Sequence, residues 1–205
     1  MKNIIALSAI TAFTAIPTMA EHEPSYDFIQ TGFAKNSYDN SNINLDGIKI
    51  GGNFEFNEKL YFNGEYQSTG DEYVNYKTKL EQHLKKFTMG IGYKINITPG
   101  TSLFAHLNYQ DLQFKEKSPY HRVDYNKNGY QLGAGIRSMV TFNTEIYGKL
   151  TYADIDYDAI MDLTVGTRIL FNRNFGGYIE YLRSDSNNSN DFKYEGYSLG
   201  LSYQF

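Results

Sequence analysis

The sequence predicts an all-β fold, a ten-stranded antiparallel up-and-down transmembrane β-barrel, with eight strands as the alternative count. Three observations lead to this prediction. Large apolar residues alternate with small or polar ones along most of the chain, the segments between these runs alternate between short and long, and the chain ends on an aromatic residue within such a run. Alternation with a period of two residues places the two sets on opposite faces of a strand.

The last nine residues show the alternation most clearly. From 197 to 205 every odd position is large and apolar or aromatic, and every even position is small or polar. In an open sheet this terminal strand would be an exposed edge, whereas in a closed barrel it pairs with the first strand. We therefore interpret it as the closing strand of a barrel.

Similar runs predict the other strands at about 26–34, 48–55, 60–67, 86–95, 103–110, 129–137, 145–152, 161–169 and 177–182. Asn-, Pro- and Gly-containing segments predict short turns at 57–59, 96–100, 141–143 and 172–174. Longer polar loops are predicted at 35–45, 69–83, 113–127 and 184–191, and a short acidic loop at 153–160. Short turns on one rim and long loops on the other are typical of outer-membrane barrels, whose turns face the periplasm.

The two faces of the predicted strands differ in charge. The apolar face carries no charged residue. A charge facing lipid near the midplane costs about 2–4 kcal/mol, so we interpret this face as the lipid-facing one. The charges then lie in the lumen, where we predict a paired network, because unpaired buried charges are unfavourable. Its predicted members are Lys49, Glu65, Lys86, Lys94, Arg137, Glu145, Lys149, Asp162, Arg168 and Glu180, with Glu55 on the same face.

Composition limits the alternatives. The 205 residues include 19 Tyr and 14 Phe but no Trp and no Cys, so a disulfide framework and a lipoprotein anchor are excluded. The formal net charge of −4, without a basic block, argues against a nucleic-acid partner. Lys2, an apolar run at 4–16 and a small residue at Ala20 predict a cleaved secretory signal at 1–20, followed by the barrel domain at 21–205.

With these strands, these turns and the terminal Tyr203-Gln-Phe205, the chain resembles small outer-membrane β-barrel proteins of Gram-negative bacteria. The resemblance implies that Tyr203 and Phe205 are an assembly signal in the outer membrane. It also implies four kinds of partner: the barrel assembly machinery, periplasmic chaperones, outer-membrane lipid and lipopolysaccharide. A narrower resemblance, carried by Gly133-Ala-Gly-Ile-Arg-Ser138, is to the barrel family named for a sulfation-dependent quorum factor. From that family we carry over the barrel and not the signalling role.

Two functions remain open. The first is a structural and surface-interaction role through extracellular loops, and the second is a narrow porin-like channel for small solutes. Inward-facing glycines either make room for large side chains to cross the lumen or leave a thin water path. We expect no enzyme activity and no cofactor, because His106 lies in mid-strand without an evident serine partner. We also expect no metal site, since Asp154-Ile-Asp-Tyr-Asp158 continues with Ala159 and Val165 where a calcium loop needs Gly and Glu.

Overall fold

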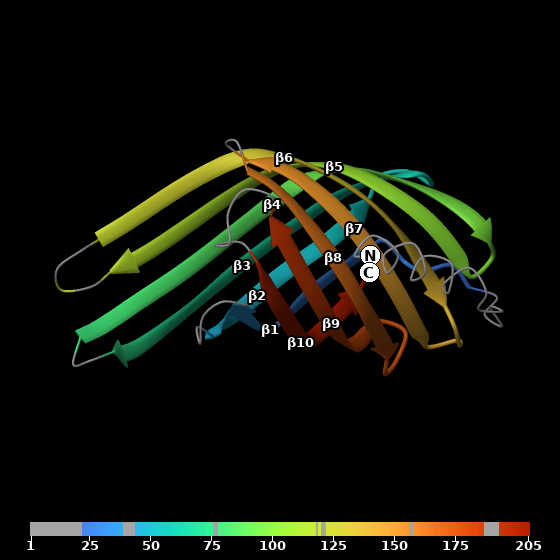
Figure 1. Cartoon of the computed structure of the whole chain (residues 1–205). Helices are drawn as coiled ribbons and strands as arrows, with labels where there is room; N and C mark the ends of the chain where they lie inside the picture. Colours follow the sequence, from blue (N-terminus) through green and yellow to red (C-terminus); the bar gives the residue numbers. More distant parts are fainter. Residues whose placement is uncertain are drawn as a thin grey trace, which may run out of the picture.

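The computed structural model describes residues 22–38, 44–75, 78–117, 119, 122–155, 158–186 and 193–205. These residues form ten strands in one closed antiparallel barrel (Figure 1). Each strand pairs with its neighbours in sequence, and β1 (Phe28–Tyr38) closes the barrel against β10 (Tyr194–Gln204). This confirms the predicted fold with ten strands. None of the described residues belongs to a helix long and apolar enough to cross a membrane.

The remaining strands follow in order around the barrel. They are β2 (Asn44–Glu55), β3 (Leu60–Asn75), β4 (Thr78–Thr98), β5 (Thr101–Lys117), β6 (Arg122–Met139), β7 (Thr144–Ile155), β8 (Asp158–Leu170) and β9 (Phe175–Ser186). The predicted short turns are found between β2 and β3, β4 and β5, β6 and β7, and β8 and β9.

The prediction of long loops on the other rim is wrong. Much of the predicted loops at 69–83 and 113–127 is strand, because β3 and β4 pair up to Asn75↔Thr78, and β5 and β6 up to Lys117↔Arg122. The predicted loops at 35–45, 153–160 and 184–191 are shortened in the same way. Apolar alternation ends where the strands leave the apolar band, whereas backbone pairing does not depend on hydropathy and continues.

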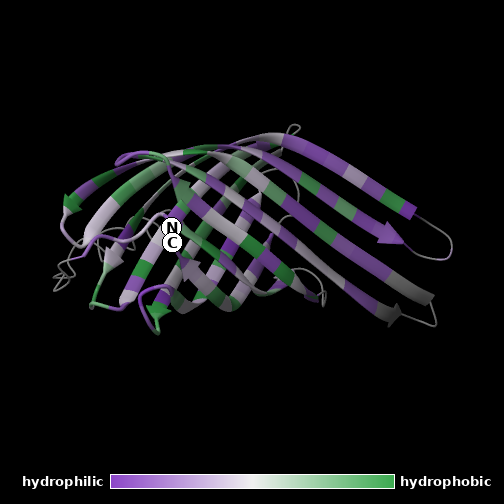
Figure 2. Ribbon diagram, turned by 180° about the vertical axis from the view of Figure 1, so that it is seen from behind, coloured by the Kyte–Doolittle hydropathy of each residue, from purple (hydrophilic) through white to green (hydrophobic). Residues whose placement is uncertain are grey.

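The four strands β3 to β6 extend past their neighbours as a projecting sheet, at the left of Figure 1. The last pair between β2 and β3 is Asp46↔Gly70, and the last pair between β6 and β7 is Gly129↔Ile155. Beyond these pairs, the ladders that the described residues show are those of β3 with β4 and of β6 with β5. The projecting sheet is predominantly hydrophilic (Figure 2).

The outer wall of the barrel is apolar and exposed. Ile91 and Leu107 are each 55% exposed and Leu199 is 62% exposed, although all three lie in the middle of their strands. Figure 2 shows the resulting alternation of hydrophobic and hydrophilic residues along each strand. Most of the buried residues are instead polar and face inward, so the usual arrangement of a soluble protein is inverted, as lipid surroundings require.

Candidate functional site

The structure places all ten predicted charged residues on the inner wall of the barrel. Eight are buried, and Glu65 and Lys149 are half-buried. Their position follows from the strand period, since each alternate side chain points to the lumen. The buried members are Lys49, Lys86, Lys94, Arg137, Glu145, Asp162, Arg168 and Glu180.

A first layer of the network lies near the turn end. Glu145 accepts a hydrogen bond from Nε of Arg137 through one oxygen and lies 3.2 Å from Nη1 of Arg168 through the other. Arg168 also donates from Nη2 to Oε1 of Gln30 at 3.0 Å. The Phe28 ring centre lies 3.8 Å from the Arg168 guanidinium carbon and 5.0 Å from that of Arg137. Since β1 and β6 lie on opposite sides of the barrel, this layer bridges the lumen.

A second layer is centred on Glu180. Its two carboxylate oxygens accept hydrogen bonds from the Lys49 ammonium, from the Tyr147 hydroxyl at 2.8 Å and from the Ser198 hydroxyl at 2.9 Å. The Gln30 amide also donates to it at 3.3 Å, and this contact joins the first two layers. Lys49 lies 3.1 Å from a second carboxylate, that of Glu65. The central carboxylate is therefore fully hydrogen-bonded, as a buried charge requires.

A third layer lies towards the projecting sheet. Lys86 on β4 donates to Asp162 on β8 at 2.7 Å, and Asp162 also accepts from Ser184 at 2.7 Å. Lys94, by contrast, pairs at the turn end with Glu55 at 2.6 Å. Among the described residues, no carboxylate lies within ion-pair distance of Lys149, so this one predicted member faces the lumen without a direct partner.

Four rings lie against glycines of the neighbouring strand. A Cβ atom placed on Gly92 would lie 2.0 Å from Cζ of Tyr61, and one placed on Gly166 would lie 2.5 Å from Cζ of Tyr147. Phe104 covers Gly135 and His106 covers Gly133 in the same way, and in all four cases ring and glycine are direct cross-strand partners. The inward glycines therefore make room for side chains in the lumen.

The segment before β1 fills the turn-end mouth. The Tyr26 hydroxyl lies 2.9 Å from the Ser102 hydroxyl, and its ring centre lies 4.8 Å from that of Tyr61 and 4.4 Å from the Arg137 guanidinium carbon. Burial raises the pKa of Tyr26 to about 12, so that the phenol stays neutral between its cationic neighbours. Sequence reasoning placed Tyr26 at the start of the first strand and gave it no such role.

The opposite mouth is narrowed by apolar side chains. Leu45, Leu84 and Leu112 are buried together inside the barrel, with Tyr38 and Phe114 packed against them. The space left between the two mouths is a cavity of about 130 Å³, lined by eight of the ten predicted charged residues. It is smaller than the roughly 300 Å³ at which ligand pockets begin.

Comparison with known proteins gives the following matches. Residues 5–162 match the family model described as outer membrane protein beta-barrel domain. No curated protein matches the sequence. Among solved structures, the NanC porin is similar with a TM-score of 0.54 at 9% identity, over 87% of this chain and 100% of that chain. Ail, the attachment invasion locus protein of Yersinia pestis, is similar with a TM-score of 0.48 at 16% identity, over 88% and 100% of the two chains. At these identities the likeness concerns the fold alone.

Proposed function

The chain belongs to the family of outer membrane protein β-barrel domains, and from this premise we propose that it is a non-conducting surface-interaction protein acting through its projecting sheet. The barrel anchors this sheet in the outer membrane, and the sheet presents strand edges to extended polypeptides outside the cell. The predicted signal at 1–20 belongs to the same proposal, because its residues lie outside the described part of the chain.

The filled lumen is the observation that supports this function over the channel. The ion pair of Lys86 and Asp162 connects β4 to β8, four strands away around the barrel. Arg137 and Arg168 both contact the ring of Phe28, which lies on β1. Tyr26 occupies one mouth and a leucine cluster lies at the other. A conducting path needs continuous water, and side chains that cross the lumen leave less room for it.

The end of β6 beyond Gly129 supports strand addition. Among the described residues its last pair with β7 is Gly129↔Ile155, and the ladder that the structure describes for residues 122–128 is the one with β5. Near the turn, Met139 donates its N–H towards β5 and Val140 donates towards β7. This alternation directs the N–H and C=O groups of the even residues Arg122, Asp124, Asn126 and Asn128 away from β5. An open row of donors and acceptors is a template for an extended chain.

The other predicted partners also belong to this proposal. Tyr203 and Phe205 lie side by side at the end of β10, with ring centres 5.3 Å apart, and Phe175 lies 4.9 Å from Tyr203. We propose that this aromatic group is the assembly signal recognised by the barrel assembly machinery and periplasmic chaperones. Lipid and lipopolysaccharide contact the apolar wall. The narrower resemblance to the quorum-factor family stays a prediction.

We expect the refolded protein to be electrically silent in a planar lipid bilayer. The same preparation should show heat-modifiable migration on a gel, as a control that the barrel is folded. Silence of the folded protein supports the surface-interaction function. Discrete, reproducible conductance steps would contradict it and would support the porin-like channel instead.

We expect Asn126→Pro to reduce binding of an extended peptide about tenfold, because it removes an edge N–H and places a ring where the added strand must lie. The probe is a short synthetic peptide of alternating threonine and valine, titrated against the protein in vesicles. Asn126→Ala is the matched control, since it keeps the N–H and should leave binding unchanged. Equal binding by both variants, or no binding by the unmodified protein, would contradict the proposed edge.

A further inference from the structure

The cavity inside the lumen is surrounded by more positive than negative charge. Five cations and three carboxylates of the charge network line it, and a fourth carboxylate, Glu145, binds two of the cations. The lining cations are Lys49, Lys86, Arg137, Lys149 and Arg168, and the lining carboxylates are Glu65, Asp162 and Glu180. Among the described residues of this network, one positive charge is therefore left without a negative counterpart.

The uncompensated charge belongs to Lys149. Each of the other four cations that line the cavity lies within 3.2 Å of a carboxylate. Lys149 is half-buried on β7, and Glu65 and Glu180 interact with it electrostatically from beyond ion-pair distance. Both of these carboxylates are already bound by Lys49. A charge held away from bulk water needs a partner, because its desolvation is costly.

The wall of the same cavity also holds hydrogen-bond donors without acceptors. Asn63 on β3 is more than nine-tenths buried, and its Nδ2 has no partner among the described residues. The same holds for both Nη atoms of Arg137 and for Nε of Arg168, and for Nε2 of His106, which donates in one neutral tautomer. The unpartnered acceptor in this wall is Oδ1 of Asn108. Buried polar groups without partners indicate a missing water or ion, and an excess of donors favours an anion.

We propose that the cavity binds one small monovalent inorganic anion, of the size class of a halide, beside the Lys149 ammonium. The anion supplies the missing negative charge and accepts hydrogen bonds from the wall, whereas a water molecule would leave the charge uncompensated. The volume of about 130 Å³ excludes large organic anions. Tyr26 at one mouth and the leucine cluster at the other enclose the bound ion. The anion site does not depend on the projecting sheet, so the site and the strand-edge binding can fail separately.

The test is urea unfolding of the refolded protein in zwitterionic vesicles, with chloride replacing gluconate at constant ionic strength. Gluconate is the reference because it is too large for the cavity. An anion that binds only the folded barrel lowers the unfolding equilibrium constant. We expect a decrease of about tenfold for each tenfold rise in chloride above its dissociation constant.

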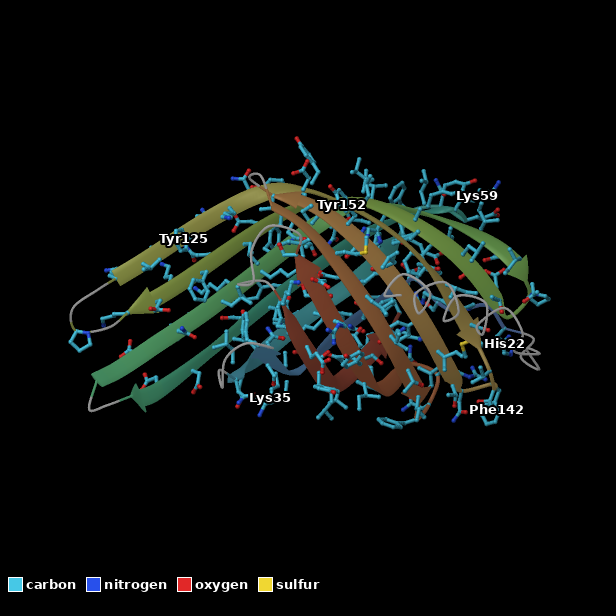
Figure 3. All side chains as sticks on the ribbon, viewed as in Figure 1. His22, Lys35, Lys59, Tyr125, Phe142 and Tyr152 are labelled. Carbon is cyan, nitrogen blue, oxygen red and sulfur yellow. The ribbon has the colours of Figure 1, made fainter. Side chains whose placement is uncertain are left out.

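Lys149→Gln should remove the dependence on chloride, because it removes the uncompensated charge. Lys59→Gln is the matched control and should keep the full dependence, since Lys59 is exposed and Figure 3 shows its side chain at the outer margin of the molecule. Equal unfolding of the unmodified protein in chloride and gluconate would overturn the proposal. So would a chloride dependence of Lys149→Gln that matches that of the unmodified protein.

A second measurement needs no variant and therefore does not depend on how Lys149→Gln folds. Crystals of the unmodified protein are grown in bromide, and the anion is located by its anomalous scattering. We expect a peak inside the lumen beside the Lys149 ammonium. Peaks at exposed cations alone would overturn the proposal. A lumen peak without any chloride dependence in solution would mark an adventitious ion only, and would overturn it as well.

Discussion

Glu180→Ala is expected to lower the free energy of unfolding by about 3–5 kcal/mol, the loss typical when one partner of a buried ion pair is removed. The carboxylate accepts hydrogen bonds from Lys49, Tyr147, Ser198 and Gln30. These donors lie on both sides of the seam, the junction of β1 and β10 at which the barrel closes. Alanine leaves the ammonium of Lys49 with Glu65 alone. The measurement is equilibrium unfolding by urea in lipid vesicles.

Glu195→Ala is the matched control for Glu180→Ala. Glu195 on β10 pairs with Arg183 on β9, the strand that also carries Glu180. The Glu195 side chain is 34% exposed and the Arg183 side chain is 48% exposed. Exposed pairs contribute at most about 1 kcal/mol, so this variant should remain near the unmodified protein. Equal losses in the two variants would contradict the special role of the lumen network.

Gly92→Val is expected to destabilise the barrel by about 3 kcal/mol, at the upper end of the usual range for overpacking. The new Cβ atom would lie 2.0 Å from Cζ of Tyr61. Tyr61 cannot withdraw, because it is 1% exposed and its ring lies against that of Tyr26. The same urea experiment measures the effect.

Gly64→Val provides the matched control for Gly92→Val. A Cβ atom at Gly64 would meet only the Thr88 carbonyl oxygen, at 3.8 Å, which is ordinary contact. This variant should therefore differ little from the unmodified barrel. Tyr61→Ala should make the Gly92→Val substitution less damaging, because the two effects involve the same space and are not additive. A loss at Gly92 that persists without the Tyr61 ring would contradict this explanation.

The strand faces could be predicted from the sequence because side-chain direction alternates strictly along a strand. Every predicted member of the charge network, from Lys49 to Glu180, points inward for this reason. The ends of the strands on the projecting side could not be predicted in this way. Around Lys115 and Asp124, which pair in the sheet, both faces of the strands carry polar residues. Hydropathy therefore does not distinguish strand from loop in this part of the chain.

The partners within the lumen could not be predicted from spacing. Lys86 pairs with Asp162 at a sequence separation of 76, and the pairing depends on the shear that fixes the relative heights of β4 and β8. The contacts of Arg137 and Arg168 with Phe28 also depend on barrel closure, because Phe28 lies on β1, far from both arginines in sequence.

The Tyr26 side chain in the barrel mouth has a consequence for the order of assembly. Its contacts reach Tyr61 on β3, Ser102 on β5 and Arg137 on β6, so its docking site exists only after these later strands have been made and arranged. The adjoining β1 joins β10, and Phe28 pairs with Gln204 near the other end of the chain. Local hairpins form before such distant contacts, because closing a long loop is entropically unfavourable. We expect the first described residues of the chain to be among the last to reach their final place, entering the mouth as the seam closes.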